Sequence, residues 1–79
     1  MMEKITKSSI KKNALIMLAK NEEIAIEAYE CYNEGKIKEL AILFEKEEIM
    51  PVNANMIEDI EYCCIISEDV YFISPCTHL

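Results

Sequence analysis

Three cysteines and the single histidine of this chain are the residues whose chemistry could bind a metal ion. They lie toward the C-terminal end, as Cys63, Cys64, Cys76 and His78. Zinc sites use thiolate and imidazole ligands, but they space the cysteines as C-x-x-C pairs, a spacing that this chain lacks. The adjacent residues Cys63 and Cys64 face opposite sides of an extended strand, so they cannot both bind one ion. We therefore predict no metal and no cofactor, and we expect the four cysteines, Cys31 included, to be reduced thiols packed as small hydrophobic residues.

A second set of chemically active groups consists of four carboxylates at helical spacing. Glu23, Glu27, Glu30 and Glu34 recur at i, i+4, i+7 and i+11, which places them in one stripe along a helix. Most charged stripes are simply solvated helix faces. The functional alternative is a docking surface for a basic protein, such as a nucleic-acid-binding protein whose cationic side chains it occupies. A third alternative is a second copy of this chain, whose Lys4, Lys7 and Lys11 also keep helical spacing.

The sequence offers little that could catalyse a reaction. It has one histidine, no arginine, no glycine-rich phosphate loop and no arrangement of a nucleophile with a base. The carboxylates are expected on solvent-facing helix positions rather than in a cavity. We predict that the protein is not an enzyme.

The charge of the chain is divided by position. Residues 1–20 carry a net charge of +4, whereas residues 21–79 carry a net charge of −11, which gives −7 in total. Because nucleic-acid binding depends largely on neutralising phosphates, this balance makes direct binding to nucleic acid unfavourable. The apolar run at residues 14–19 is too short for a signal peptide or a membrane span. We expect a cytoplasmic protein with no membrane segment.

The first half of the chain has an apolar pattern with alternating spacings of four and three. The residues at these positions are Ile10, Ala14, Met17, Asn21, Ile24, Ala28 and Cys31. This pattern is typical of a heptad seam, in which a polar residue such as Asn21 fixes register or oligomeric state. Two interpretations compete: one continuous or kinked helix over residues 8–34, or a break at Lys20–Asn21 with Asn21 capping a second helix. The unbroken apolar phase favours the single helix. The apolar content exceeds what so small a core needs, which favours self-association into a homodimer through the seam or through a strand edge.

The remaining helices and strands are predicted from the residues that commonly end or cap such elements and from the residue types between them. Gly35 should end the first helical segment, residues 36–48 should form an antiparallel second arm, and Pro51 should follow it. Asn53 and Asn55 should be turn and cap residues for a short helical turn over residues 55–61. Residues 62–74 are β-branched and aromatic, with Glu68-Asp69 at the centre, which predicts a β-hairpin. Since both strands are apolar on both faces, each face should be covered.

These elements predict an α+β fold in a single small domain over residues 1–79. A helical hairpin of two long or three shorter helices, within residues 7–49, would precede a two-stranded antiparallel β-hairpin. The function that we predict is an acidic interaction or inhibitor module whose anionic helical face binds a larger basic protein. The alternative is a winged-helix-like regulator, with the order helix, helix, helix, strand, strand, whose lysine-rich N-terminus contacts nucleic acid.

Overall fold

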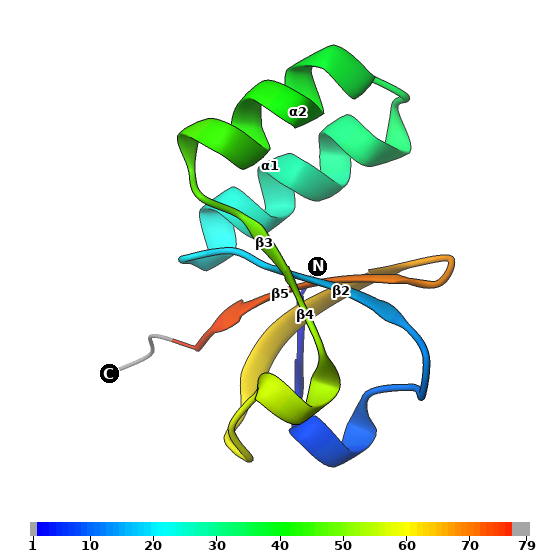
Figure 1. Cartoon of the computed structure of the whole chain (residues 1–79), viewed down its shortest axis with the longest axis vertical. Coiled ribbons are helices and arrows are strands. Elements are labelled where there is room, and N and C mark those ends of the chain that lie inside the picture. The colour runs from blue at the N-terminus through cyan, green and yellow to red at the C-terminus, as the bar shows by residue number, and fades with distance from the viewer. Residues whose placement is uncertain (1, 77–79) are drawn as a thin grey trace.

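A five-stranded mixed β-sheet forms the centre of the protein, and two helices cover one of its faces (Figure 1). The computed structural model describes residues 2–76. The strands are β1 (Glu3–Ile5), β2 (Leu15–Leu18), β3 (Met50–Val52), β4 (Tyr62–Ser67) and β5 (Val70–Pro75). The helices are α1 (Glu22–Asn33) and α2 (Ile37–Lys46), and two 3-10 turns are η1 (Lys7–Ser9) and η2 (Ala54–Met56).

Strand β5 lies in the middle of the sheet, whose order is β1-β4-β5-β2-β3. It pairs antiparallel with β4 through the two-residue loop Glu68-Asp69, and parallel with β2, so that Leu15 lies opposite Val70. The outer strands β1 and β3 pair antiparallel with β4 and β2. A segment near the start of the chain therefore lies beside a segment near its end.

Successive residues of β5 point into two different hydrophobic cores. Phe72 packs in the core under the helices, whereas Tyr71 and Ile73 pack in the core on the other face of the sheet. This alternation follows from the period of two in a β-strand. It confirms the prediction that both faces of the C-terminal hairpin are covered.

The helical side of the sheet is covered by α1, and α2 packs on α1 (Figure 1). Ala25 and Ala28 are fully buried, and their small side chains allow α1 to approach the strands closely. The ring of Phe72 lies 6.2 Å from that of Tyr29 in an edge-on arrangement and 5.7 Å from that of Tyr32. Aromatic pairs at such distances add to the apolar area that they bury, so Phe72 anchors α1 on the sheet.

The opposite side of the sheet is covered by η1, η2 and the segments beside them. Ile10, Ala14 and Ala54 pack there against the cluster of buried side chains to which Ile57 belongs. The Tyr71 hydroxyl accepts a hydrogen bond from the backbone N–H of Lys11 at 3.1 Å. This contact ties the segment between η1 and β2 to the central strand.

The C-terminal end of α1 is a Schellman motif. The N–H of Gly35 donates to the carbonyl of Tyr32, and the N–H of Lys36 donates to the carbonyl of Cys31. Gly35 has a φ of 72°, a conformation that glycine adopts without steric cost. The prediction that Gly35 ends the first helical segment and turns the chain into the second arm is confirmed.

The predicted architecture as a whole is wrong, although the α+β class and the C-terminal hairpin are correct. The helical hairpin covers only residues 22–46 of the predicted helical part 7–49, and the hairpin strands β4 and β5 belong to a five-stranded sheet. The three additional strands are only three or four residues long. Strands this short carry too few alternating positions for a recognisable pattern.

The preferred single helix over residues 8–34 is also wrong. Residues 15–18 form strand β2, where Ile16 is only 1% exposed, and Asn21 caps a helix that begins at Glu22. Both faces of strand β2 pack against hydrophobic cores, so residues 15–18 are all apolar. A continuous apolar run of this length fits the period of a helix as well as that of a strand, which is why the apolar spacing continued across Asn21.

Two smaller expectations need correction. The winged-helix order is absent from residues 2–76, because a strand precedes α1 and only two α-helices are present there. The helical turn expected over residues 55–61 is the 3-10 turn η2, which Asn53 caps by accepting from the N–H of Asn55 at 2.9 Å. Neither α-helix in this part of the chain has the length and apolar content that crossing a membrane requires.

Candidate functional site

The four glutamates of the predicted stripe lie together on the outer face of α1. Glu23, Glu27, Glu30 and Glu34 are all exposed. At about 100° of rotation per residue they fall within a sector of about 60°. The fully buried residues Ala25 and Ala28 lie on the opposite side of the helix, against the sheet. We call these four residues the acidic stripe.

The acidic stripe is largely uncompensated. Lys36 Nζ lies 3.1 Å from Glu34 Oε1 and 3.9 Å from Glu39 Oε2, and the hydrogen bond that Lys36 donates to Glu34 raises the pKa of Lys36. Within residues 2–76, Glu23, Glu27 and Glu30 take part in no salt bridge. The helical layer as a whole, residues 21–49, has nine glutamates against three lysines.

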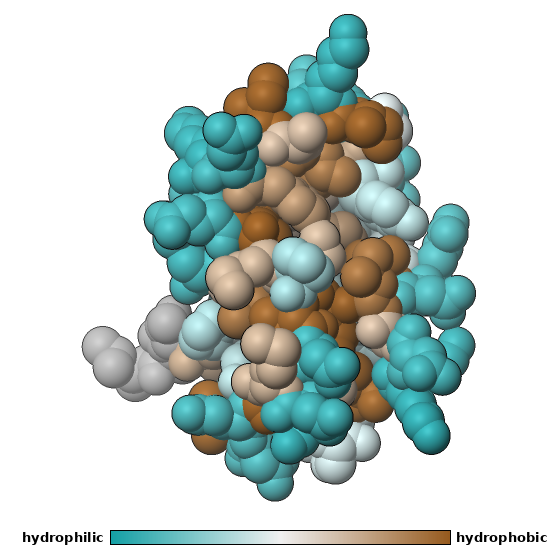
Figure 2. Space-filling view, in the orientation of Figure 1, coloured by the Kyte–Doolittle hydropathy of each residue, from teal (hydrophilic) through white to brown (hydrophobic). Residues whose placement is uncertain are grey.

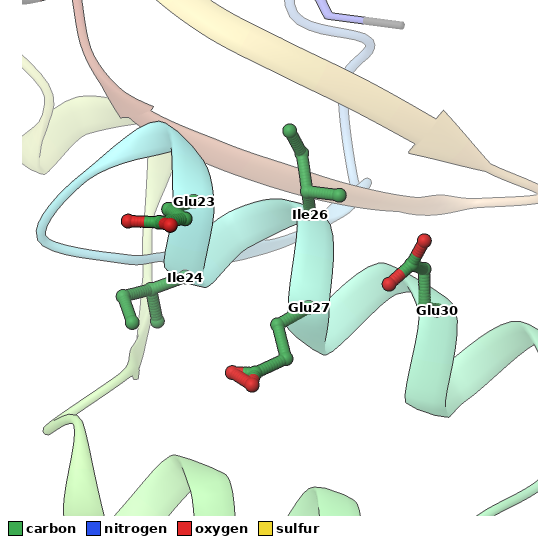
Figure 3. Close-up of a pocket in the computed structure, with 5 residues that line it drawn as sticks. All are labelled: Glu23, Ile24, Ile26, Glu27 and Glu30. Carbon is green, nitrogen blue, oxygen red and sulfur yellow. The ribbon is translucent and has the colours of Figure 1, made fainter.

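Isoleucine side chains flank the carboxylates on both sides. Glu23, Ile24, Ile26, Glu27 and Glu30 line a shallow depression of about 310 Å³ on α1 (Figure 3). Figure 3 shows Ile26 and Glu30 directed to one side of the helix and Ile24 and Glu27 to the other. Ile26 is 38% exposed. The surface therefore combines negative charge with apolar area that a partner could bury.

A second depression continues this surface toward α2. It measures about 230 Å³ and is lined by Glu27 and Cys31 of α1 and by Glu39, Ile42, Leu43 and Lys46 of α2. Ile42 is 65% exposed. In the view of Figure 2, apolar side chains lie at the surface of the helical layer beside hydrophilic ones. Glu27 lines both depressions and joins them.

The residues of the predicted seam do not form one seam. Ile10 and Ala14 pack in the core on the face away from the helices, whereas Met17, Ile24 and Ala28 pack in the core under them. Asn21 caps α1. Because the sheet separates these two groups, a coiled-coil dimer through this set is wrong; the prediction of self-association itself stays a prediction.

The lysines Lys4, Lys7 and Lys11 do not share a helix face either. Lys4 lies on β1, Lys7 in η1 and Lys11 in the segment that follows. Lys4 Nζ lies 3.9 Å from Glu61 Oε2, and Lys11 Nζ lies 3.2 Å from Asp69 Oδ1. These contacts are within one chain, so the lysine stripe that would oppose the acidic stripe of a second copy is not formed.

The cysteines are divided by the two faces of the sheet, as predicted for Cys63 and Cys64. Cys64 packs in the core away from the helices, where burial, followed by the charge of Glu3, raises its pKa to about 12. Cys63 faces α1, and its Sγ donates to Oε1 of Glu22 at 2.8 Å. Burial, followed by hydrogen bonds with the Cys76 thiol and Glu22, raises the pKa of Cys63.

Of the candidate metal ligands, Cys63, Cys64 and Cys76 lie within the residues that the structure describes. No group of three or more histidine, cysteine, aspartate or glutamate side chains among residues 2–76 is placed to hold a metal ion. His78 lies outside the described residues.

The contact of Cys63 with Glu22 and Cys76 was not predicted from the sequence. The sequence does contain a signal that places Cys76 near Cys63. A two-residue loop at Glu68-Asp69 fixes the hairpin register, in which Cys63 lies opposite Ser74. Cys76, two residues farther along, falls on the same face of the sheet. The position of Glu22 depends on how α1 crosses the sheet, which no local pattern encodes.

Comparisons with known proteins do not assign a function. No protein-family model, no curated protein and no solved structure matches this chain. Function is therefore inferred from the acidic stripe and its flanking apolar side chains.

Proposed function

We propose that this protein is a small, non-catalytic interaction or inhibitor module of the cytoplasm, and that the outer face of α1 binds a larger basic protein. The observation that supports the proposal most directly is the acidic stripe. The four carboxylates of the stripe point away from the sheet. Of these four, only Glu34 has a lysine partner within residues 2–76.

Repulsion between the carboxylates of the acidic stripe already acts in the free protein. Like charges at i, i+4 on a helix destabilise it by roughly 0.2–0.5 kcal/mol per pair. Glu23 with Glu27 and Glu30 with Glu34 are such pairs. A partner with lysine or arginine side chains would relieve this repulsion and would also associate faster through long-range attraction.

The apolar residues beside the stripe support a protein partner rather than a simple counter-ion. Ile26, which is 38% exposed, lies beside the carboxylates of the stripe. Ile42, which is 65% exposed, lines the adjoining depression. Burial of apolar area stabilises a complex by about 25 cal/mol per Å². A basic segment that also carries apolar side chains would satisfy both features.

Direct binding to nucleic acid is disfavoured by the same charges. The chain has a net charge of −7, and the helical layer contributes −6 of it. Phosphates would be repelled by this surface, and the lysines that remain are few and partly paired with carboxylates.

The test compares two triple variants with equal changes in net charge. One is Glu23→Gln/Glu27→Gln/Glu30→Gln on the stripe, and the other is Glu45→Gln/Glu58→Gln/Glu68→Gln at exposed positions elsewhere. Affinity capture from the native host with the wild-type chain identifies the partner, and calorimetric titration then gives Kd for each variant. We expect the stripe variant to bind at least about tenfold more weakly and the control to change little.

Salt provides an independent check of the same complex. Raising NaCl from low concentration to about 0.5 M shortens the screening length to about 4 Å and should weaken binding strongly. Binding that is insensitive to salt, capture of no basic protein, or equal losses in the two triple variants would each contradict the proposal.

A further inference from the structure

Two cysteines and one glutamate meet on the helical side of the sheet, where β4 and β5 end beside the start of α1. Cys63 Sγ donates a hydrogen bond to Glu22 Oε1 at 2.8 Å. Burial raises the pKa of the Cys63 thiol, and the Cys76 thiol raises it further, so the two thiol groups interact. Cys63 and Cys76 therefore lie on one face of the sheet, and Cys63 contacts a carboxylate that can accept a proton.

The hairpin register explains this meeting. Cys63 pairs with Ser74, and Cys76 is the diagonal neighbour of Cys63 on the same face. Diagonal neighbours have Cα atoms about 7–8 Å apart, slightly more than the usual 4.4–6.8 Å of a disulfide. Since Cys76 lies beyond Tyr62↔Pro75, the last pair of the ladder, its backbone is free of strand pairing and a small shift closes the gap.

The two thiols differ in their access to solvent. Cys63 is 3% exposed, whereas Cys76 is half-buried. An oxidant in solution therefore reaches Cys76 first, and Cys63 lies behind it as a resolving thiol. Redox-sensing cysteines are accessible to solvent and often lie next to a resolving cysteine, and the half-buried Cys76 beside the buried Cys63 has this order of access.

We propose that Cys76 and Cys63 form an intramolecular disulfide when the protein meets a peroxide, with Glu22 as the proton acceptor for Cys63. This is a modification site that goes beyond the proposed function and does not depend on it.

The chemistry balances in two steps. In the first, the Cys76 sulfur attacks one oxygen of hydrogen peroxide, the O–O bond breaks, and Cys76 becomes a sulfenic acid as one water is released. In the second, the Cys63 sulfur attacks the Cys76 sulfur, the Cys63 proton passes to Glu22, and the departing hydroxide takes up this proton as a second water. The two thiols lose two hydrogen atoms, and the peroxide is reduced to water.

The other two cysteines are placed less favourably. Cys64 is 2% exposed and faces the opposite core, so it cannot reach Cys76. Cys31 lies in the depression between the helices, where burial, followed by the charge of Glu39, raises its pKa. No second cysteine lines that depression in the part of the chain that the structure describes. Both residues therefore provide internal controls.

The experiment uses the full chain under native conditions. The protein is treated with hydrogen peroxide at low protein concentration, alkylated with N-ethylmaleimide, digested after glutamate residues and read by mass spectrometry. We expect the loss of two hydrogen atoms and a link between peptides 62–68 and 69–79, with the remaining two cysteines alkylated. Cys31→Ser and Cys64→Ala should form the same link, whereas Cys76→Ser should form none.

The order of the two steps has its own readout. In Cys63→Ala the sulfenic acid on Cys76 should persist and react with dimedone, and in Glu22→Gln the disulfide should form several-fold more slowly while dimedone-reactive protein accumulates. A link that survives in Cys76→Ser, a link through Cys31, or a disulfide between two chains would overturn the proposal. A rate unchanged in Glu22→Gln would overturn the proton-transfer step.

Discussion

The side-chain oxygen of Asn21 accepts a hydrogen bond from the backbone N–H of Ile24 at 3.0 Å, and this contact sets the start of α1. Asn21 itself has an extended backbone, with φ −154° and ψ 172°. The chain is a strand until Leu18 and a helix from Glu22. One residue therefore marks the boundary between the sheet and the helix that bears the acidic stripe.

Replacing Asn21 by leucine should lower the free energy of unfolding by about 1 kcal/mol, because the N–H of Ile24 loses its acceptor. Urea denaturation followed by circular dichroism measures this change. Asn21→Asp, which keeps an acceptor, should stay close to wild type. A more stable Asn21→Leu protein would show that the cap contributes nothing.

Replacing Glu48 by glycine should raise stability by about 0.5 kcal/mol. Glu48 follows the end of α2 with a φ of 55°, and the N–H of Ile49 donates to the carbonyl of Phe44 there. A residue with a side chain pays about 1–2 kcal/mol of folding free energy to adopt this left-handed conformation, and glycine avoids that cost. Glycine loses more backbone entropy on folding, which offsets about 0.5–1 kcal/mol of the gain.

The matched control for that change is Glu45→Gly within α2, which should lower stability by about 1 kcal/mol. Thermal unfolding of both proteins gives the comparison. Equal losses in the two variants would show that the backbone at Glu48 is not strained.

Removing the hydroxyl of Ser74 should stabilise the protein by about 1 kcal/mol. Ser74 is fully buried on β5, and its Oγ has no hydrogen-bond partner among the residues that the structure describes. A buried hydroxyl without a partner costs about 1–3 kcal/mol, and Ser74→Ala removes that cost. Chemical denaturation of Ser74→Ala and of the half-buried control Ser67→Ala tests this; a loss of stability only in Ser74→Ala would contradict it.

Alkaline pH should destabilise the reduced protein through Cys64. Its pKa rises from 9.0 to about 12 on folding because the thiolate would be buried. Above pH 9 the unfolded chain ionises this thiol and the folded chain does not, so stability falls by up to about 1.4 kcal/mol per pH unit until pH 12. Below pH 9 this group has no effect. Unfolding measured against pH should show a shallower decline for Cys64→Ala than for wild type.

The parts of the fold that depend on local sequence were predicted, and the parts that depend on distant pairing were not. The hairpin of β4 and β5 is evident from β-branched and aromatic residues around Glu68-Asp69, and the turn at Gly35 from its glycine. By contrast, β2 is a strand because it pairs with β5, 55 positions farther along the chain. Its four residues alone are compatible with either a helix or a strand.

The candidate site divides in the same way. The acidic stripe requires only that residues 22–33 be helical, so its spacing was enough to place its carboxylates on one face. The contact of Glu22 with Cys63 requires α1 to cross the sheet at one particular place. That crossing is set by Phe72 packing on Tyr29 and Tyr32, a tertiary contact without a sequence signature.

The central position of β5 has a consequence for the order in which the molecule folds. On one side β5 pairs with β4, and β4 pairs in turn with β1. On the other side β5 pairs with β2, and β2 pairs in turn with β3. Until residues 70–75 have been synthesised, a nascent chain holds two separate strand pairs and no continuous sheet. The slow step of folding should therefore be the docking of β5 between them, a closure over a large separation in sequence that keeps apolar strand faces open until late.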